Sequence, residues 1–179
     1  MDFIYSIDNA VVDFMVGIQN SFLSFIFNIF TVISEKGLIW IAIGIILVAF
    51  RKTRKIGICY AISLAVSFSL SELVIKDLVC RERPFIQNEA LKLLISAPDG
   101  HSFPSSHSAS SFASAVALFL HNRKYGAIAL VGAFMIAFSR LYFTVHYFTD
   151  VLGGTVLGTA VAITVYVIYR KIEKRTEQA

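Results

Sequence analysis

The residues best suited to catalysis lie in one polar stretch, residues 139–150, between two long apolar runs. It carries Arg140, His146 and Asp150. Unpaired charge near hydrocarbon is energetically costly, so the presence of these residues needs an explanation. His146 and Asp150 are four residues apart, so a helical turn would place them on one face. A carboxylate there can hold one imidazole nitrogen and leave the other free as a nucleophile or base.

The guanidinium of Arg140 is planar and permanently charged, which suits a phosphate group. Together with His146 and Asp150 it predicts attack on a phosphoryl group beside a bilayer. The alternative is that Asp150 only caps the helix that follows and Arg140 reaches toward the lipid headgroups.

Two further polar clusters precede this stretch. The first contains Lys76 and Arg83, and the second is the run Ser105-Ser106-His107 at the start of an apolar segment. A helix N-terminus offers free N–H groups and the positive end of the helix dipole, so serines there would help to bind an anion. Alternatively, Lys76 and Arg83 contact phospholipid headgroups, and Ser105 is an ordinary helix cap.

Combined, the three clusters describe a phosphoryl-transfer site. His146 would attack phosphorus and His107 would protonate the leaving oxygen, after which water would hydrolyse the phosphohistidine with His107 acting as base. Cations would stabilise the developing charge, and Glu72 is expected to pair with Lys76, four residues on. The scheme needs no metal or other cofactor. The sequence agrees with this, since it lacks an acidic cluster of the kind that binds Mg²⁺. Two histidines in opposite protonation states predict a bell-shaped dependence of the rate on pH.

The composition places this chemistry in a membrane. Of the 179 residues, 56% are hydrophobic and 16% are charged, and several apolar runs approach the ~20 residues that span a bilayer. The sequence therefore predicts a single-domain integral membrane protein. The net charge of +4 arises from short basic clusters at the ends of apolar runs, which argues against nucleic acid as a partner. Neither Cys59 nor Cys80 has a metal-like spacing, and Cys59 is expected to be a small core residue.

The N-terminal segment is expected to lie along the membrane surface. Residues 1–20 place apolar side chains at helical spacing with aspartates between them, as in an amphipathic interfacial helix. Residues 22–33 are apolar but too short to span alone, so we expect a second helix that dips into the membrane. The competing interpretation makes residues 14–33 a full span. We also hypothesise that the amphipathic helix shapes the entry of a lipid chain.

Five apolar runs are expected to form the membrane-spanning core. They are residues 38–50, which should begin a few residues earlier to reach full thickness, 56–75, 106–120, 126–145 and 149–169. Gly154 and Gly158 form a small-xxx-small pattern that favours close helix contact. The connection 77–105 is long, as functional loops often are, and a short helix is expected near residues 87–96.

The basic clusters at residues 51–55, 121–124 and 170–175 should share the cytoplasmic side, which puts the three functional clusters on the outer side. The predicted fold is an all-α integral membrane protein, a bundle of five, or alternatively six, transmembrane helices with an N-terminal amphipathic interfacial helix. Five spans place the N-terminus outside and six place it inside. The expected segments are the N-terminal helices (1–33), the transmembrane core (34–169) and a basic cytoplasmic tail (170–179).

The order and spacing of the clusters resemble the signature of the type 2 phosphatidic acid phosphatase superfamily, also called lipid phosphate phosphatases. That signature is Lys, six residues, Arg-Pro; then Pro-Ser-Gly-His; then Ser-Arg, five residues, His, three residues, Asp. Here the corresponding residues are Lys76, Arg83-Pro84, Pro104-Ser105-Ser106-His107, Ser139-Arg140, His146 and Asp150. With the apolar pattern, the resemblance covers roughly residues 35–169.

The resemblance implies that His146 is the nucleophile, Asp150 its orienting partner and His107 the acid and base. It also implies a set of phosphate ligands: Lys76, Arg83, Ser105, Arg140 and the backbone N–H of residue 106. Ser106 is a departure, because the family usually has glycine there. Glycine permits a positive φ, so serine predicts an ordinary helical or extended backbone, with its hydroxyl as an additional donor.

Members of comparable size are bacterial and dephosphorylate undecaprenyl pyrophosphate, phosphatidylglycerophosphate, phosphatidic acid or lipid A. The short chain and the outward-facing site are similar to the undecaprenyl pyrophosphate phosphatases, with the plasma membrane as the expected location. A phosphatidylglycerophosphate or phosphatidic acid phosphatase is the alternative. The expected partners are the lipid substrate and membrane lipids, and no signal specifies an oligomeric state. A transporter would carry its charges deep within the spans, and a non-catalytic lipid-binding protein would tolerate loss of His146.

Overall fold

A computed structural model describes residues 2–178; Met1 and Ala179, the ends of the predicted N-terminal and tail segments, lie outside the described residues. All regular elements of the described chain are helical, which confirms the all-α prediction. In chain order they are α1 (Asp2–Ile18), α2 (Ser21–Ile33), the 3₁₀ turn η1 (Glu35–Gly37), α3 (Leu38–Ala49), α4 (Arg54–Ser69), the π-helical turn η2 (Leu70–Ile75), α5 (Lys76–Val79), α6 (Pro84–Gln87), α7 (Ser106–His121), α8 (Arg123–Tyr142) and α9 (Phe148–Gln178).

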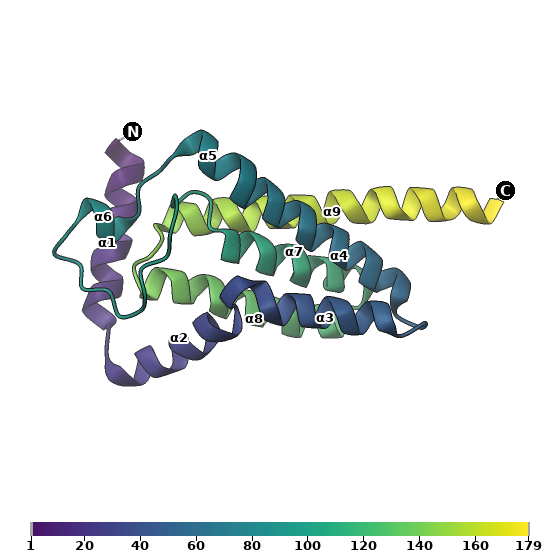
Figure 1. Ribbon diagram of the computed structural model, residues 1–179, viewed down its shortest axis with the longest axis horizontal. Helices are drawn as coiled ribbons and strands as arrows, with labels where there is room; N and C mark the ends of the chain where they lie inside the picture. The colour runs from purple at the N-terminus through teal and green to yellow at the C-terminus, as the bar shows by residue number, and fades with distance from the viewer. Residues whose placement is uncertain (1, 179) are drawn as a thin grey trace.

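The bundle is built around α7, which lies among α4, α8 and α9 and packs against all three (Figure 1). Its buried positions are mostly alanine and serine, so neighbouring helices can approach closely. Gly154 and Gly158 of α9 face this helix, and a Cβ at position 158 would lie 2.1 Å from the carbonyl oxygen of Ala109. The close contact predicted from the small-xxx-small pattern is therefore confirmed.

The outer surface of the bundle is apolar. Among the described residues, three helical stretches are long and apolar enough to cross a membrane: Arg54–Gln87, α8 and Phe148–Thr176. The α1–α2 pair adds a fourth if it forms one bent span. α3 and α7 pack beside these helices with 12 and 16 residues, lengths of about 18 and 24 Å. Exposed side chains such as Ile128 and Val156 would face lipid, so the chain is a multi-pass membrane protein. A count of five or six spans stays a prediction.

The N-terminal helices form a corner. α1 and α2 meet at 118°, so residues 14–33 do not form one straight helix, and a full span in this region stays a prediction. Asn20 accepts a hydrogen bond from the N–H of Leu23 and starts α2. Gln19 donates to the carbonyl oxygen of Tyr142, and the Tyr142 hydroxyl bonds to the backbone of Asn20. These contacts fasten the corner to the end of α8.

Two local predictions are wrong. α3 does not begin before residue 38, because Lys36 and Gly37 adopt left-handed backbone conformations with φ of 51° and 69°. No helix forms over residues 88–96, and only the four-residue α6 precedes them. The apolar residues Leu93 and Ile95, which suggested a helix, instead pack against a buried cluster that contains Phe27 and Tyr142.

The two ends of the bundle differ in character. The loops that hold the candidate functional residues gather at one end, together with α1, α2 and α6 (Figure 1). The α3–α4 turn, the α7–α8 turn and the C-terminal part of α9 lie toward the other end. These are the positions of the three basic clusters, so the predicted segregation of basic and functional clusters is confirmed. Residues 170–178 continue α9 without a break.

Candidate active site

His146 and Asp150 lie at the start of α9, at the end of the bundle that holds the loops. Nδ1 of His146 lies 3.6 Å from Oδ2 of Asp150, and Nε2 lies 3.2 Å from Nη1 of Arg83. Because a guanidinium can only donate, Nε2 of His146 must accept, and the ring proton is on Nδ1, facing the carboxylate. The lone pair of a neutral imidazole therefore lies on Nε2, the arrangement that a nucleophile needs.

Asp150 has a structural as well as a chemical role. Its Oδ2 accepts a 2.8 Å hydrogen bond from the N–H of Tyr147, just before α9 begins, and another from the hydroxyl of Ser102. A carboxylate in the first helical turn that reaches back in this way satisfies an otherwise free donor at the helix start. The capping alternative and the orienting role are compatible, because the cap fixes the carboxylate beside His146.

Burial lowers the pKa of His146 to about 4, because an imidazolium would be desolvated there. Asp150 opposes this shift, and Arg83 and Lys76 add to it. The ring, with only 3% of its side chain exposed, is therefore neutral at physiological pH. A neutral ring is the reactive form for attack on phosphorus.

Arg83 is held mainly by backbone. Its guanidinium donates to the carbonyl oxygens of Asp99, Gly100 and Val145 at 2.9–3.0 Å, besides its contact with His146. The bonds to Asp99 and Gly100 hold the 88–105 loop against Arg83. The resemblance predicts that Arg83 binds phosphate, and in this substrate-free arrangement it spans the loop and the histidine.

Arg140 differs from Arg83 in having no such support. Its side chain is buried at the end of α8 with 4% exposure, and Nε and Nη2 have no hydrogen-bond partner among the described residues. A buried cation without partners costs free energy. Arg140 lines a cavity that His107 and His146 also line. An anion in that cavity would satisfy the unused donors, so Arg140 is well suited to bind phosphate.

Lys76 lies where the π-helical turn η2 passes into α5. Its Nζ forms a 2.7 Å ion pair with Glu72, as the four-residue spacing predicts. Glu72 also accepts a 2.5 Å hydrogen bond from Ser106, so it links α7 to η2. Such π turns often occur at functional sites. In this chain the π-helical turn lies between α4 and Lys76.

The start of α7 carries the remaining predicted residues. Ser106 is the first helical residue and has no positive φ, which confirms the expectation of an ordinary backbone conformation there. His107 lines the cavity with His146 and Arg140. Ser105 is the N-cap, and its oxygen accepts hydrogen bonds from the N–H and hydroxyl of Ser108. Ser105 therefore makes the hydrogen bonds of an ordinary helix cap, as the alternative predicted. Its role as a phosphate ligand stays a prediction.

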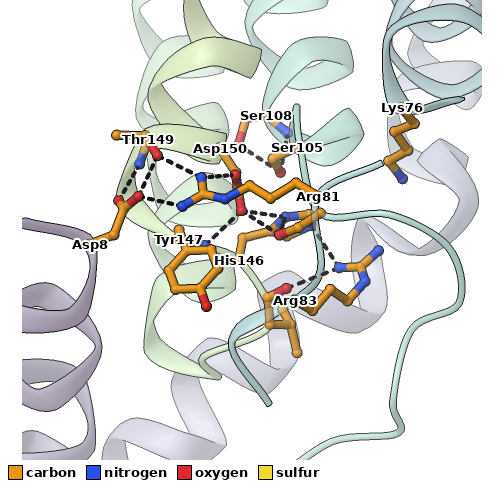
Figure 2. A network of polar contacts seen from close by, with 12 residues as sticks. Asp8, Lys76, Arg81, Arg83, Ser105, Ser108, His146, Tyr147, Thr149 and Asp150 are labelled. Atoms are coloured by element: carbon orange, nitrogen blue, oxygen red, sulfur yellow. Dashed lines mark hydrogen bonds and ion pairs between the residues drawn. The ribbon is translucent and has the colours of Figure 1, made fainter. Parts of the chain in front are cut away.

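Sequence reasoning missed a second layer of polar residues behind the catalytic pair. Arg81 donates to Oδ1 of Asp150 at 2.6 Å and to Asp8 of α1 at 2.6 Å, and Thr149 also bonds to Asp8 (Figure 2). Ser102 completes this layer by its bond to Asp150. The only signal in the sequence was a second arginine two residues before Arg83 and one of three aspartates on an amphipathic helix.

A cavity of about 1540 Å³ extends from the catalytic end into the bundle. At one end it is lined by the charged and titratable residues Glu72, Lys76, Arg83, His107, Arg140 and His146. Farther along, its walls are apolar residues of α3 and α4, including Ile41, Ile45, Leu64 and Phe68. Its lining begins at Asn28, so no described residue of α1 contributes to it. The cavity pairs an anion-binding end with an apolar channel.

The described residues include no group of three or more His, Cys, Asp or Glu placed to hold a metal ion. The two cysteines are unpaired; Cys59 is buried, as expected of a core residue, and Cys80 is exposed.

Comparison with known proteins agrees with the motif pattern. Residues 54–174 match the model of the PAP2 superfamily. The undecaprenyl-diphosphatase of Sulfolobus acidocaldarius is 34% identical over 122 residues, which cover 68% of this chain and 59% of that protein. The putative undecaprenyl-diphosphatase YbjG of Escherichia coli is 34% identical over 125 residues, covering 69% and 60%. The chain thus spans about 60% of the length of these relatives.

A solved structure extends the likeness to the fold. The PAP2-type phosphatidylglycerolphosphate phosphatase of Bacillus subtilis superposes with a TM-score of 0.76 at 25% identity, covering 96% of this chain and 89% of that one. Its extent includes α1 and α2, which lie outside the residues that match the family model. The match over residues 54–174, with all three motifs inside it, confirms the resemblance seen in the sequence: the chain belongs to the PAP2 superfamily.

Proposed function

We propose that the protein hydrolyses a membrane lipid phosphate or pyrophosphate without a metal, through a phosphohistidine on His146. The observation that carries the proposal is the buried guanidinium of Arg140, with free donors, beside a neutral His146 held by Asp150. An anion-binding end continuous with an apolar channel fits a substrate with a charged head and a long hydrocarbon tail.

The first chemical step transfers the phosphoryl group to the enzyme. Nε2 of His146 attacks phosphorus, the bond from phosphorus to the leaving oxygen breaks, and His107 gives that oxygen a proton. Asp150 stabilises the positive charge that develops on the imidazole. Nη1 of Arg83 must leave Nε2 before attack, and a phosphate oxygen is the natural acceptor to draw it away.

The second step releases phosphate. Water attacks the phosphohistidine, the nitrogen–phosphorus bond breaks, and His107, now deprotonated, takes the proton from water. Arg140, Arg83 and Lys76 stabilise the charge on the phosphoryl oxygens in both steps. For Lys76 this requires the ammonium to turn part of its hydrogen bonding from Glu72 to the substrate.

For the substrate we favour undecaprenyl pyrophosphate, converted to undecaprenyl phosphate and phosphate at the outer face of the plasma membrane. The names of the Sulfolobus and Escherichia relatives support this choice. The basic clusters at the far end of the bundle support a cytoplasmic location for that end and an outward-facing site. The Bacillus structure, named as a phosphatidylglycerolphosphate phosphatase, supports phosphatidylglycerophosphate or phosphatidic acid as the second candidate.

The test is phosphate release by the purified protein in detergent with EDTA present. Undecaprenyl pyrophosphate, phosphatidylglycerophosphate and phosphatidic acid would be compared at equal mole fraction in the micelle. We expect release to survive EDTA and to be fastest from undecaprenyl pyrophosphate. Fastest release from phosphatidylglycerophosphate would select the second candidate. Absence of release from all three lipids, or release that EDTA abolishes, would overturn the proposal.

The pH dependence offers a separate prediction. Since the pKa of His146 is lowered to about 4, its reactive neutral form should persist at pH values where free imidazole is protonated. We expect the acid limb of a bell-shaped kcat/KM profile to lie near pH 4, while loss of the proton from His107 sets the alkaline limb. The measurement is kcat/KM from pH 3.5 to 9 in one mixed buffer, with folding checked by circular dichroism. An acid limb near the ordinary histidine pKa would contradict the assignment of His146.

A further inference from the structure

Arg81 lies between two buried carboxylates. Its Nη1 is 2.6 Å from Oδ1 of Asp150, and its Nη2 is 2.6 Å from Oδ2 of Asp8 (Figure 2). Both carboxylates have fully buried side chains, and the guanidinium also stacks on the ring of Tyr147, 4.1 Å from its centroid. Every one of these contacts is short, and together they fix the guanidinium on three sides.

Asp8 belongs to α1, far from the motifs in sequence. It lies on the face of α1 that packs against α8 and α9, next to Val12 and Met15, while Phe3 and Phe14 on the other face are exposed. Besides Arg81, its carboxylate accepts hydrogen bonds from the N–H and the hydroxyl of Thr149 at 2.9 and 2.6 Å. Among the described residues, the hydrogen-bond donors to the Asp8 carboxylate, Arg81 and Thr149, therefore both belong to the polar layer directly behind Asp150.

We propose that Asp8 and Arg81 are positioning residues for the catalytic pair, so that α1 is a working part of the active site. The inference rests on the proposed function. Asp8 holds Arg81 in place, and Arg81 holds Oδ1 of Asp150. This leaves Oδ2 directed at Nδ1 of His146 and at the N–H of Tyr147. A carboxylate bound at only one oxygen can rotate, and rotation would remove the support that the imidazole needs as it becomes positive.

The geometry requires an arginine at position 81. Two nitrogens of one planar group contact two carboxylates at once, and the ammonium of lysine could pair closely with only one of them. The charges around His146 are also distributed by side. Two carboxylates share the guanidinium of Arg81 on the Nδ1 side of the ring, and Arg83 faces Nε2 on the opposite side. Asp8 thus supports the site through Arg81 and through its two bonds to Thr149, and it touches neither the histidine nor the cavity.

This role differs from shaping lipid entry. Because no described residue of α1 lines the cavity, loss of Asp8 should lower kcat for short and long substrates alike. An entry role would instead raise KM for the long lipid and leave a short ester unaffected. The split between kcat and KM therefore separates the two roles, and it also separates positioning from a general loss of folding.

The experiment is a double-mutant cycle of Asp8→Asn and Arg81→Gln, assayed with dioctanoyl phosphatidic acid and with undecaprenyl pyrophosphate. Each single change should lower kcat about 10- to 100-fold, the usual scale for removing an outer partner of a functional histidine, with KM for the short ester unchanged. Because Asp8 acts mainly through Arg81, adding Asp8→Asn to Arg81→Gln should cause a smaller loss than Asp8→Asn causes alone. Asp13→Asn, the same change at an exposed position of α1, is the matched control and should keep wild-type activity.

The outcomes separate cleanly. Wild-type kcat in Asp8→Asn, a full multiplicative loss in the double variant, or a rise confined to KM for the long lipid would overturn the positioning role. Melting temperatures in detergent show whether each variant is folded. If Asp8→Asn is unstable, Arg81→Lys provides the second route, with the same drop in kcat and an unchanged KM for the short ester expected. Absence of phosphate release by the wild-type protein from either lipid would instead refute the proposed function, and the inference would fall with it.

Discussion

Replacing His146 with alanine is expected to lower kcat for phosphate release at least about 10³-fold, because the covalent route loses its nucleophile. None of the other three histidines is placed to replace it, since His101 does not line the cavity. His107 is anchored in the first turn of α7, and His121 lies in its last turn, at the opposite end of the helix. The measurement is single-turnover phosphate release in detergent, and His121→Ala is the matched control, with unchanged turnover expected.

The same position can be tested by trapping the intermediate. A substrate labelled in the transferable phosphate should leave label on wild-type protein when the reaction is quenched in alkali, where phosphohistidine is stable, and the label should be lost in acid. His107→Ala should accumulate more label from p-nitrophenyl phosphate, because that leaving group needs no proton but hydrolysis of the intermediate still needs a base. Turnover by His146→Ala above one hundredth of the wild-type rate would refute the nucleophile assignment.

Arg140→Met is expected to have opposite effects on activity and stability. Loss of a preorganised donor to the transferring group should lower kcat about 10²- to 10³-fold. Nε and Nη2 of Arg140 are buried without hydrogen-bond partners among the described residues, and the attraction of Glu35 for the charge leaves these two donors unsatisfied. An apolar side chain of similar length removes that cost, and the melting temperature should stay level or rise.

The control for Arg140 lies on the same helix. Arg123→Met makes the same change at the exposed first residue of α8, where the guanidinium lies over the ring of Phe119, and should leave kcat unchanged. Activity and melting temperature would be measured on the same preparations in the same detergent. A fall in the melting temperature of Arg140→Met that accounts for the lost activity would show that Arg140 is structural.

The pairing of His146 with Asp150 was predictable because its geometry is local. His146 and Asp150 are one helical turn apart, so their spacing in the sequence is also their spacing in the fold. The ion pair of Lys76 and Glu72 was predictable for the same reason. The long apolar runs likewise identified α4, α8 and α9, because a helix in lipid must be apolar over its whole exposed length.

The second layer was not predictable, because it depends on contacts between distant segments. Arg81 meets Asp8 across 73 positions and Asp150 across 69, and no local pattern encodes such a distance. The loop after α6 failed for a related reason. Leu91, Leu94 and Ile95 have helix-like spacing, but the long-range packing of Leu93 and Ile95 on Tyr142 and the bonds from Arg83 decide the conformation of the loop.

The π-helical turn at Leu70–Ile75 has a consequence for insertions and deletions in this part of the chain. A π turn holds one residue more than an α-helical turn, so the extra residue is absorbed where it occurs. A chain one residue shorter within this turn can close a regular α-helix and still direct Lys76 at the cavity. The same loss within α4 would rotate everything after it by about 100° and turn Lys76 away. In alignments of this superfamily, a single-residue gap therefore belongs at 70–75. A deletion elsewhere in the helix would keep the six-residue interval from Lys76 to Arg83, so that interval does not by itself guarantee a working site.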